Sequence, residues 1–400
     1  MSRKHDIGFE LCDADNHYYE TIDACTRHLP SAYAHRGIQF VSKGKRTLCL
    51  AGEKVLHFIP NPTFEPIAVP GSGDQYYRGQ RPMHKPLKEI IELEESCRSE
   101  YRNPVDRVRV LDEQGIEAAF LFPTFGYGIE EALANDIEAM VATVRAFNRW
   151  LLDDWSFCYE GRLFAAPLIT LSDPAAAVEE VEWAVQHGAR IVTIRPAPAI
   201  CADKRRSPGD PIFDPVWAAI AEADVGVAFH IADSGYQRYA ADWGDDPEFR
   251  PIARGNMTMG KLYYQERPIF DTIAALVVHG VFRRHPTLRV ASIENGALWL
   301  PLLVKKLTKA FNQQGNQAFC EPPIETLRRH LWVSPYAEDD FEEVAELIGV
   351  DRILFGSDWP HAECLAEPAE YASLLEHFGE EDVEKIMSRN FRMFAPLTVS

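Results

Sequence analysis

Four places in the sequence carry side chains that commonly bind metal ions or transfer protons. In the motif Asp13-Ala-Asp15-Asn-His17, Asp15 and His17 are two positions apart. On an extended strand these two side chains point to the same side, so they can share one ion. The other three places are His230 after the apolar run Val225–Phe229, Glu294 in Ser292-Ile-Glu-Asn-Gly296, and Asp358 with His361 in Gly356-Ser-Asp-Trp-Pro-His361.

Two aspartates and two histidines are the predicted metal ligands: Asp15, His17, His230 and Asp358. This set of oxygen and nitrogen donors suits Zn²⁺, Mn²⁺ or Fe²⁺ better than Ca²⁺, and we expect one divalent ion, with Zn²⁺ as the first choice. The two carboxylates balance the charge of the ion, which still polarises a substrate oxygen or lowers the pKa of bound water. An Asp-x-His pair also arises by chance, so the prediction depends on all four side chains meeting at one place.

Each of these side chains lies at the end of a short apolar segment that is typical of a strand. Eight segments are predicted strands: Gly8–His17, Ile116–Pro123, Leu163–Leu171, Ala189–Pro196, Val225–Ile231, Leu288–Glu294, Leu331–Tyr336 and Arg352–Trp359. Several are almost continuously apolar, which indicates strands buried on both faces. Segments with helical spacing follow most of them, and Asp173 and Asp214, each followed by proline, are predicted to cap two of these helices.

This alternation of strands and helices predicts an α/β fold, specifically a (β/α)₈ TIM barrel that forms a single domain over residues 1–400. A doubly wound open sheet is the alternative, but no Gly-x-Gly-x-x-Gly turn follows the first predicted strand. In TIM barrels the reactive groups lie at the carboxyl ends of the strands. The predicted ligands therefore lie at the positions where TIM barrels carry their reactive groups.

A long insertion, residues 21–103 (Thr21–Asn103), separates the first two predicted strands. It contains a predicted β-hairpin, Ile38–Ser42 and Arg46–Leu50 joined by Lys43-Gly44-Lys45, followed by a stretch rich in proline, glycine and tyrosine. A connection of this length inside a compact domain is typical of a lid or an interface arm. A second irregular excursion is expected at Pro247–Arg267.

Charge and cysteine content narrow the classes of function. The chain has 41 Lys and Arg against 60 Asp and Glu, a formal net charge of −19. Such an acidic protein repels nucleic-acid phosphates and anionic lipid headgroups, so we expect neither nucleic acid nor a membrane as partner. The eight cysteines are scattered, and the first ten residues lack the apolar core of a secretion signal, so we expect a cytoplasmic location.

Taken together, these motifs resemble the amidohydrolase superfamily. The resemblance is closest to the branch that groups metal-dependent hydrolases with aminocarboxymuconate-semialdehyde decarboxylase and aromatic-acid decarboxylases. That family carries Asp-x-His-x-His on strand one, a His after strand five, a His after strand six and Gly-x-Asp-x-Pro on strand eight. Here Asp13-Ala-Asp15-Asn-His17, His230 and Gly356-Ser-Asp358-Trp-Pro360 match in order, and Gly280–Val290 resembles the segment leading into strand six.

Three departures from the family pattern affect the expected site. Asp15 replaces the first strand-one histidine, and Glu294 stands where the strand-six histidine is expected. On strand four, Arg195 stands where binuclear members carry a bridging lysine. The resemblance therefore implies one metal rather than two, with Glu294 as a further ligand or as the acid/base.

The resemblance implies two chemistries for one set of residues. Non-oxidative decarboxylation of a small aromatic or unsaturated carboxylic acid is favoured, and hydrolysis of an amide, ester or lactone is the alternative. A barrel without metal that acts as a binding module is a third hypothesis from a different class. The predicted catalytic residues are Asp358, Glu294 and His361.

A carboxylic-acid or carbonyl substrate would contact residues near the ends of the strands, and the predicted substrate-binding residues are Arg195, Tyr18 and Tyr19. Arg78 or Arg81 of the insertion can also pair with a substrate carboxylate. Aromatic side chains of the insertion either stack on a planar substrate or pack the insertion onto the barrel or onto a neighbouring subunit. The resemblance also implies a homodimer.

Overall fold

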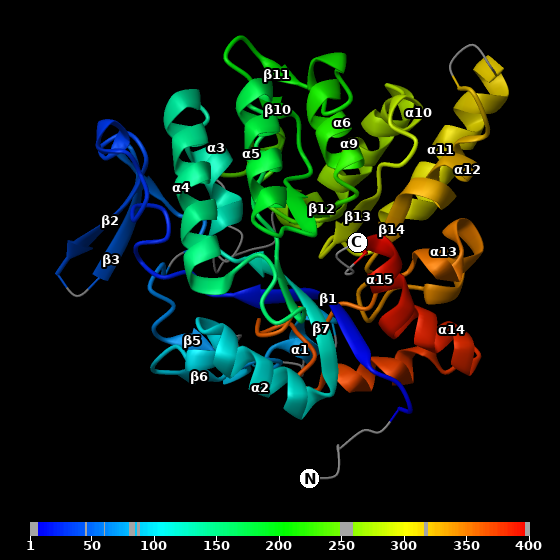
Figure 1. Cartoon of the computed structure of the whole chain (residues 1–400), viewed down its shortest axis with the longest axis horizontal. Coiled ribbons are helices and arrows are strands. Elements are labelled where there is room, and N and C mark those ends of the chain that lie inside the picture. The colour runs from blue at the N-terminus through cyan, green and yellow to red at the C-terminus, as the bar shows by residue number, and fades with distance from the viewer. Residues whose placement is uncertain are drawn as a thin grey trace.

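The computed structural model describes residues 7–44, 46–59, 61–79, 85, 89–248, 259–315 and 319–396. Its centre is α/β structure with two parallel sheets and helices packed around them (Figure 1). The first sheet has the order β1–β7–β8, with β1 at Leu11–Tyr18, β7 at Ile116–Pro123 and β8 at Leu163–Ala165. The second has the order β14–β13–β12–β9, with β9 at Ile191–Ile194, β12 at Gly226–His230, β13 at Val290–Ile293 and β14 at Leu331–Val333.

Single parallel bridges connect the two sheets at both ends. They join Leu168 to Thr193, Val333 to Ile353, and Asn16 to Trp359. Backbone hydrogen bonds extend the last contact, since the amide of Ala14 donates to the carbonyl of Phe355 over 2.8 Å. The segment 353–359 therefore lies between β14 and β1, which brings the first and last predicted strands together.

Seven of the eight predicted strands overlap an observed strand, and one prediction was wrong. No strand forms over Arg352–Trp359, where the chain makes a short 3₁₀ turn at Val350–Arg352 and then isolated bridges. The left-handed backbone at Asp358, with φ of 61°, interrupts the extended conformation there. The predicted strand Leu163–Leu171 is also shorter than expected, because regular pairing ends at Ala165.

The helices cover the sheets as the sequence pattern predicts, with one local difference. Asp173 caps α5 (Pro174–Gln186), because its side chain accepts a hydrogen bond from the amide of Ala176. Asp214 does not cap α6 (Asp214–Glu222); it lies inside the helix and pairs with Arg284 over 2.8 Å. The cap in this region is Asp210, which begins the 3₁₀ turn that precedes α6.

The insertion between β1 and β7 contains the predicted hairpin. β2 (Ile38–Lys43) and β3 (Arg46–Ala51) pair antiparallel, and β4 (Lys54–Leu56) adds a third strand. The turn residue Lys45 lies outside the described residues. This small sheet projects at one side of the molecule beside α4, whereas β5 (Ile67–Ala68) pairs with β6 (Leu93–Glu94) near α2 (Figure 1).

The remaining described elements are mostly helical. They are η1 (Ser31–Tyr33), α1 (Asp74–Tyr77), η3 (Ser99–Tyr101), α2 (Pro104–Gln114), η4 (Gly126–Gly128), α3 (Ile129–Ala132), α4 (Ile137–Trp155), β10 (Ala199–Ile200), β11 (Arg205–Arg206), η5 (Pro211–Phe213), α7 (Gln237–Ala241), α8 (Met259–Tyr263), α9 (Glu266–Val278), α10 (Val281–Arg284), α11 (Trp299–Gln314), α12 (Pro323–His330), α13 (Phe341–Ile348), η7 (Val350–Arg352), η8 (Pro368–Leu375), α14 (Glu380–Glu384), η9 (Lys385–Arg389) and α15 (Asn390–Phe394). Helix α8 falls inside the excursion expected to be irregular, and residues 249–258 of that excursion lie outside the description. Among the described helices, none is both long enough and apolar enough to cross a bilayer.

Candidate metal centre

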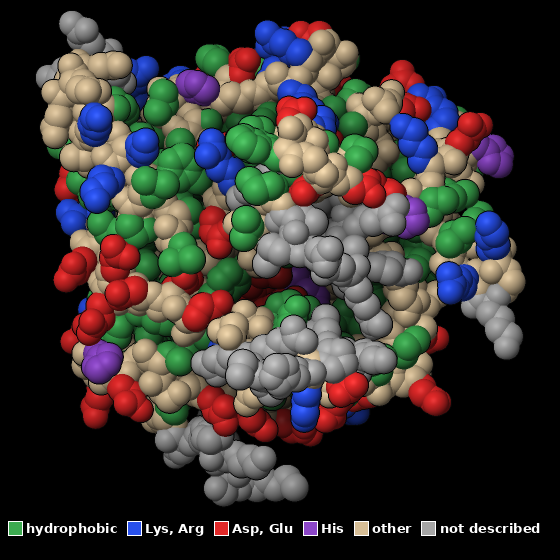
Figure 2. Space-filling model, turned by 180° about the vertical axis from the view of Figure 1, so that it is seen from behind, with side chains coloured by type: hydrophobic (Ala, Val, Ile, Leu, Met, Phe, Trp, Pro, Cys, Tyr) green, Lys and Arg blue, Asp and Glu red, His purple; other side chains and the backbone are tan. Residues whose placement is uncertain are grey.

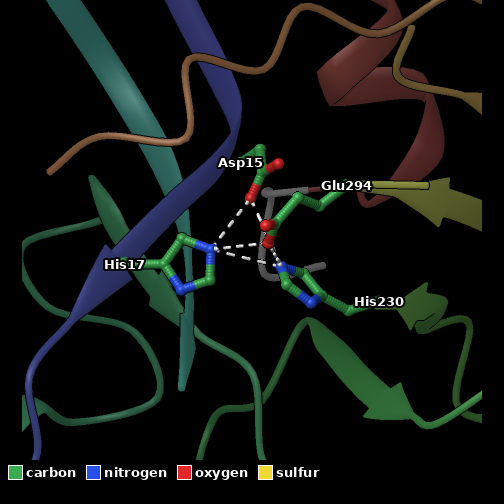
Figure 3. Close-up of side chains that lie close together, drawn as sticks. All are labelled: Asp15, His17, His230 and Glu294. Carbon is green, nitrogen blue, oxygen red and sulfur yellow. Dashed lines mark hydrogen bonds and ion pairs between the residues drawn. The ribbon is translucent and has the colours of Figure 1, made fainter. Parts of the chain in front are cut away.

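Four side chains from three strands meet at the carboxyl ends of those strands (Figure 3). Asp15 and His17 come from β1, His230 is the last residue of β12, and Glu294 directly follows β13. One ligand atom from each of the four lies within 4.8 Å of the others. The parallel register explains the meeting, because β12 and β13 are neighbours and His230 pairs with Ile293.

The distances between these ligand atoms fit a small divalent cation. His17 Nε2 lies 3.4 Å from Asp15 Oδ1, 3.4 Å from Glu294 Oε2 and 3.2 Å from His230 Nε2. His230 Nε2 lies 3.2 Å from Glu294 Oε2 and 3.5 Å from Asp15 Oδ1. Donor atoms bonded to one tetrahedral ion at about 2.0 to 2.1 Å are separated by about 3.3 to 3.4 Å.

Two features of the donors support the same fit. His230 Nδ1 donates a hydrogen bond to the backbone carbonyl of Ile231 over 3.0 Å, which leaves a lone pair on Nε2 facing the other ligands. Asp15 Oδ1 is buried and accepts no hydrogen bond within the described structure. A buried lone pair and a buried carboxylate oxygen both need an electrophilic partner, and a cation satisfies both.

The electrostatics of the cluster favour positive charge at its centre. Burial opposes charge on His17, but Asp15 and Glu294 outweigh it and raise the pKa of His17 to about 9. Burial likewise opposes ionisation of Asp15, yet contacts with His17 and His230 hold its pKa below the ordinary value. Side-chain exposure is 1% for His17 and 5% for Asp15, so water screens these interactions weakly.

Asp358 and His361 adjoin the four ligands. Asp358 Oδ1 lies 3.3 Å from His17 Nε2 and 2.7 Å from His361 Nδ1. His17, Glu294, Asp358 and His361 form a second group whose donor atoms lie within 4.8 Å of one another. Three of the four predicted metal ligands, Asp15, His17 and His230, therefore come together with Glu294, and the fourth, Asp358, contacts His17 in the second group.

The pKa values of this second pair move in opposite directions. Burial, followed by the charges of Glu294 and Glu363, raises the pKa of Asp358 well above its ordinary value. Burial and the neighbouring His17 hold the pKa of His361 well below its ordinary value. Both shifts favour the uncharged forms of Asp358 and His361.

Hydrogen bonds beside the cluster join β1, which carries Asp15 and His17, to the segment that carries Asp358. The carboxylate of Asp13 accepts hydrogen bonds from the amide and the hydroxyl of Ser357, and the amide of Asp358 donates to the carbonyl of Asp15 over 2.8 Å. Gly356 permits this approach, because a Cβ there would lie 2.6 Å from the Cβ of Asp15. The Gly-Ser-Asp sequence thus brings Asp358 close to β1.

Two of the clustered side chains lie on residues with unusual backbone conformations. Glu294 and Asp358 have φ values of 53° and 61°, in the left-handed region that residues other than glycine rarely adopt. Tyr336 holds the first of these by donating from its hydroxyl to the carbonyl of Glu294 over 2.7 Å. Strain of this kind persists where the surrounding structure enforces it, and it is concentrated at functional sites.

Tyr19 lies at the cluster, whereas Tyr18 does not. The ring of Tyr19 lies 5.9 Å from that of His361, and its hydroxyl donates to the carbonyl of Pro360 over 3.2 Å. Tyr18 packs between Trp150 and Trp155 of α4 and is 0% exposed. Because successive side chains of a strand point to opposite faces, Tyr18 faces away from His17, contrary to the expected contact with substrate.

Arg195 lies in a separate ionic network. Its guanidinium is 3.2 Å from Glu131, 3.4 Å from Glu130 and 2.9 Å from the carbonyl of Asp233. Contacts within the protein already use the nitrogens of this guanidinium, so its pairing with a substrate carboxylate stays a prediction. Arg78 is likewise paired with a carboxylate of its own helix, and Arg81 lies outside the described residues.

The loop after β7 contributes contacts that the strand-end pattern alone missed. The ring of Tyr127 stacks on His230, with centroids 4.5 Å apart and planes at 10°. Thr124 Oγ1 lies 3.1 Å from His361 Nε2. Glu20 accepts hydrogen bonds from the amides of Phe125 and Gly126, each over 2.9 Å. The signal in the sequence is Thr124-Phe-Gly-Tyr-Gly directly after a predicted strand.

The molecule is hollowed over this region. Figure 2 shows a depression in the face opposite to the view of Figure 1, with acidic and histidine side chains at its floor. Side-chain exposure at the cluster is graded, from 1% for His230 to 15% for Glu294 and 14% for Asp358. The ligands therefore lie at the base of a recess, and the two carboxylates are the more accessible members.

Comparison with known proteins gives a family model and solved structures at both high and low sequence identity. A family model described as amidohydrolase matches residues 56–392. The crystal structure of an amidohydrolase from Mycobacterium avium subsp. paratuberculosis K-10 is 48% identical, with 98% of this chain and 100% of that chain covered and a TM-score of 0.92.

Two more distant structures share the fold. A 5-carboxyvanillate decarboxylase from Sphingomonas paucimobilis is 15% identical, with 97% of this chain and 99% of that chain covered and a TM-score of 0.60. A dihydroxybenzoic acid decarboxylase from Polaromonas sp. JS666, with bound manganese and the inhibitor 2-nitroresorcinol, is 18% identical, with coverages of 82% and 94% and a TM-score of 0.58. The motif order, the cluster and the family match agree: the chain belongs to the amidohydrolase family and is an enzyme of that family.

Proposed function

We propose that this protein is a metal-dependent carboxy-lyase that removes CO₂ from a small aromatic or unsaturated carboxylic acid. The observation that carries the proposal is the convergence of Asp15, His17, His230 and Glu294 within 4.8 Å. Distant structural neighbours named as decarboxylases of dihydroxybenzoate and carboxyvanillate support this chemistry. We further propose that the bridged parallel sheets form one (β/α)₈ barrel with residues 21–103 as its lid.

In this proposal Asp15, His17, His230 and Glu294 hold one divalent ion, with Asp358 as an adjacent carboxylate. The ion supplies positive charge that stabilises negative charge developing on substrate oxygens. Zn²⁺, Mn²⁺ and Fe²⁺ all suit two histidines and two carboxylates. Manganese in the Polaromonas neighbour makes Mn²⁺ as strong a candidate as Zn²⁺.

The role of Asp358 and His361 is to hold and deliver a proton. When the bond to the carboxylate breaks, its electron pair stays on the ring or alkene carbon, which must then take up a proton. Asp358 Oδ1 and His361 Nδ1 are 2.7 Å apart, and burial keeps both groups toward their uncharged forms. Asp358 is therefore the proposed general acid, with Glu294 beside it as the alternative.

The recess also suits a planar substrate. Tyr19 and Tyr127 place aromatic rings beside His361 and His230 respectively, so the candidate site has apolar side chains next to its polar ones. Excluding water from such a site strengthens the attraction between the substrate and the groups that bind it. Tyr19 is the proposed substrate-contacting residue.

Hydrolysis of an amide, ester or lactone is the second candidate. The relative with 48% identity is described as an amidohydrolase, and its TM-score of 0.92 indicates a closely similar structure. The same carboxylate that protonates carbon in one reaction can take a proton from water in the other. The products separate the two reactions, because hydrolysis incorporates solvent oxygen and decarboxylation releases CO₂.

The test begins with the purified protein and its metal content. We expect about one equivalent of transition metal, and CO₂ release from at least one acid in a panel that includes 2,6-dihydroxybenzoate and 5-carboxyvanillate. Incorporation of ¹⁸O from solvent into a product, without CO₂, would instead establish the hydrolase. Protein that binds no metal after incubation with Zn²⁺ or Mn²⁺ would support the binding-module hypothesis and overturn both.

A further inference from the structure

The insertion between β1 and β7 is hydrogen-bonded to the segment that carries His361. The backbone amide of Gly71 donates to the carbonyl of His361 over 3.1 Å, and the amide of Gly73 donates to the carbonyl of Ala362 over 2.7 Å. Both glycines lie directly before α1. Two backbone hydrogen bonds therefore join the insertion to a predicted catalytic residue and to its neighbour.

The two segments approach each other so closely that position 71 requires glycine. A Cβ on Gly71 would lie 2.7 Å from the Cβ of Ala366 and 2.8 Å from its backbone nitrogen, so one of the two segments would have to move. Gly71 also has a φ of 72°, in the region that residues other than glycine rarely adopt. At position 73, a Cβ would lie 3.1 Å from the carbonyl oxygen of Ala362, which is a tight contact as well.

The segment that the insertion contacts is a turn that is hydrogen-bonded across its base. We call residues 357–366 the His361 turn. The amide of His361 donates to the carbonyl of Asp358 over 3.0 Å, and the amide of Leu365 donates to the carbonyl of Ser357 over 3.2 Å. So short a turn has little freedom to absorb a displacement at its end, and we expect such a displacement to move His361 as well.

The insertion is itself anchored on both sides of Gly71. Shortly before it, β5 pairs with β6, and the amide of Val69 donates to the carbonyl of Glu92 over 2.9 Å. Shortly after it, the ring of Tyr77 packs on Gly73, where a Cβ would lie 3.0 Å from the ring. The contact with the His361 turn therefore joins two restrained segments, as an accurately placed side chain requires.

We propose that Gly71 is a positioning residue: it allows the insertion to bond to the His361 turn and so fixes the place of His361 beside Asp358. Gly73 contributes the second hydrogen bond of the same contact. The insertion is then a fixed support of the site as well as its cover. This inference rests on the proposed carboxy-lyase function only for its effect on turnover, because the backbone contact is a property of the resting protein.

The main variant in the test is Gly71→Ala, which adds one methyl group at the contact with Ala366. Gly115→Ala is the first control, because Gly115 has a φ of 77° but a Cβ there would meet nothing within 4 Å in the described structure. Gly209→Ala is the second control, because a Cβ there would lie 2.6 Å from the Cβ of His279, at the end of α9. The first control reproduces the backbone strain, and the second reproduces the close contact.

Gly73→Ala is a second variant at the same contact, with a smaller expected effect. The φ of Gly73 is −103°, which alanine adopts without strain, so only the contacts with Ala362 and Tyr77 change. If Gly71→Ala does not fold, as judged by circular dichroism, the result for Gly73→Ala decides alone.

The first measurement is amide hydrogen exchange of the purified protein, followed by mass spectrometry of the peptide that covers the His361 turn. We expect this peptide to exchange at least about threefold faster in Gly71→Ala, and by a smaller factor in Gly73→Ala, because a displaced insertion loosens the turn. In both controls the peptide should exchange as in the unmodified protein. Unchanged exchange of the turn in the Gly71 and Gly73 variants would overturn the proposal.

The second measurement is turnover of whichever panel acid the unmodified enzyme converts. In Gly71→Ala we expect kcat to fall by about tenfold or more, with KM within about threefold and metal content unchanged, because His361 is misplaced while every metal ligand is kept. Gly115→Ala and Gly209→Ala should keep kcat within about twofold. An unchanged kcat in Gly71→Ala, or an equal loss in either control, would contradict the positioning role.

The two measurements distinguish failure of this proposal from failure of the carboxy-lyase proposal. No CO₂ from any panel acid with the unmodified enzyme would overturn the carboxy-lyase function and leave the exchange result standing. Hydrogen exchange needs no substrate, so it tests the contact of Gly71 with the His361 turn by itself.

Discussion

Two clusters of carboxylates in this protein neutralise their charge in different ways. In the first, Glu131 of α3 contacts three guanidinium groups, those of Arg195 at 3.2 Å, Arg205 at 2.6 Å and Arg238 at 2.6 Å. Burial opposes charge on Glu131, but the charges of Arg195, Arg205 and Arg238 and a hydrogen bond from Arg205 hold its pKa below the ordinary value. This cluster, hereafter the arginine cluster, is complete without any added ion.

The second cluster consists of Asp15, His17, His230 and Glu294 with the adjoining Asp358, and it is called the metal-ligand cluster after its proposed role. Its composition is the opposite of that of the arginine cluster. Asp15, Glu294 and Asp358 are carboxylates, and within the described part of the chain their ion pairs involve histidines, with no lysine or arginine. Buried carboxylates without a permanent cation are costly, and a histidine contributes positive charge only when protonated. The comparison shows that charge type, rather than burial, separates a structural cluster from a candidate metal site.

The largest expected effect breaks the metal-ligand cluster directly. His230→Ala removes a nitrogen ligand, so bound metal should fall from about one equivalent to near zero and turnover should drop by at least about 100-fold. Metal content is measured by plasma emission spectroscopy after desalting. His330→Gln is the control, because His330 is also buried but bonds to the carbonyl of Leu288. Full metal content in His230→Ala would remove His230 from the ligand set.

Removing the metal with a chelator tests the difference between the two clusters without a mutation, because only the metal-ligand cluster should respond. An ion at 100 to 1,000 times its Kd stabilises the folded state by about 3 to 4 kcal/mol, so a chelator should lower Tm by about 3 to 5 °C. His230→Ala should show no such shift, whereas Glu131→Gln should show the full shift from its own starting value. A chelator effect that disappears in Glu131→Gln would mean that the two clusters are coupled.

Much of the metal-ligand cluster was predictable because its members stand at strand ends. Asp15 and His17 are two positions apart on a strand, and His230 ends a continuous apolar run. These patterns predict both that the side chains are buried and which way they point. Asp358 was found despite a wrong strand, since the Gly-Ser-Asp motif places it next to β1 by a close backbone approach. The family pattern predicted the order of the motifs along the chain, and the fold brings their side chains close together in space.

Other features depend on contacts between distant segments. Glu294 was expected as either a ligand or an acid/base, and its left-handed backbone, which turns the side chain toward the histidines, is not visible in local sequence. Thr124 meets His361 across 237 positions of the chain. The carboxylates around Arg195 come from α3, an element that the strand pattern does not predict. All three features depend on tertiary contacts, which the local sequence does not predict.

Disrupting the arginine cluster should lower the free energy of unfolding and leave the amount of bound metal unchanged. Glu131→Gln keeps the size of the side chain but leaves three guanidinium groups without their shared counter-charge. We expect a loss of about 3 kcal/mol in the free energy of unfolding, reduced from the fully buried case because Arg238 is half exposed. Urea denaturation followed by circular dichroism measures it. Loss of bound metal without loss of stability would be the opposite result.

Arg195 tests whether the arginine cluster also serves the substrate. With its contacts to Glu130, Glu131 and the carbonyl of Asp233, Arg195→Met should lose about 2 kcal/mol of stability and leave KM within about twofold. The measurement is steady-state kinetics together with denaturation. A rise in KM of tenfold or more, with stability unchanged, would instead support pairing of Arg195 with a substrate carboxylate.

The smallest expected effect concerns Tyr19, which borders the metal-ligand cluster without belonging to it. Tyr19→Phe removes one hydrogen bond, from its hydroxyl to the carbonyl of Pro360 at 3.2 Å, and keeps the ring that packs on Phe64 and lies near His361. A neutral hydrogen bond of this kind contributes about 1 kcal/mol, so Tm should fall slightly and metal content should not change. If Tyr19 contacts substrate through its ring, kcat/KM stays within about threefold in Tyr19→Phe and falls much further in Tyr19→Leu. Equal losses in the two variants would assign the effect to the hydroxyl, and therefore to the position of the Pro360–His361 loop.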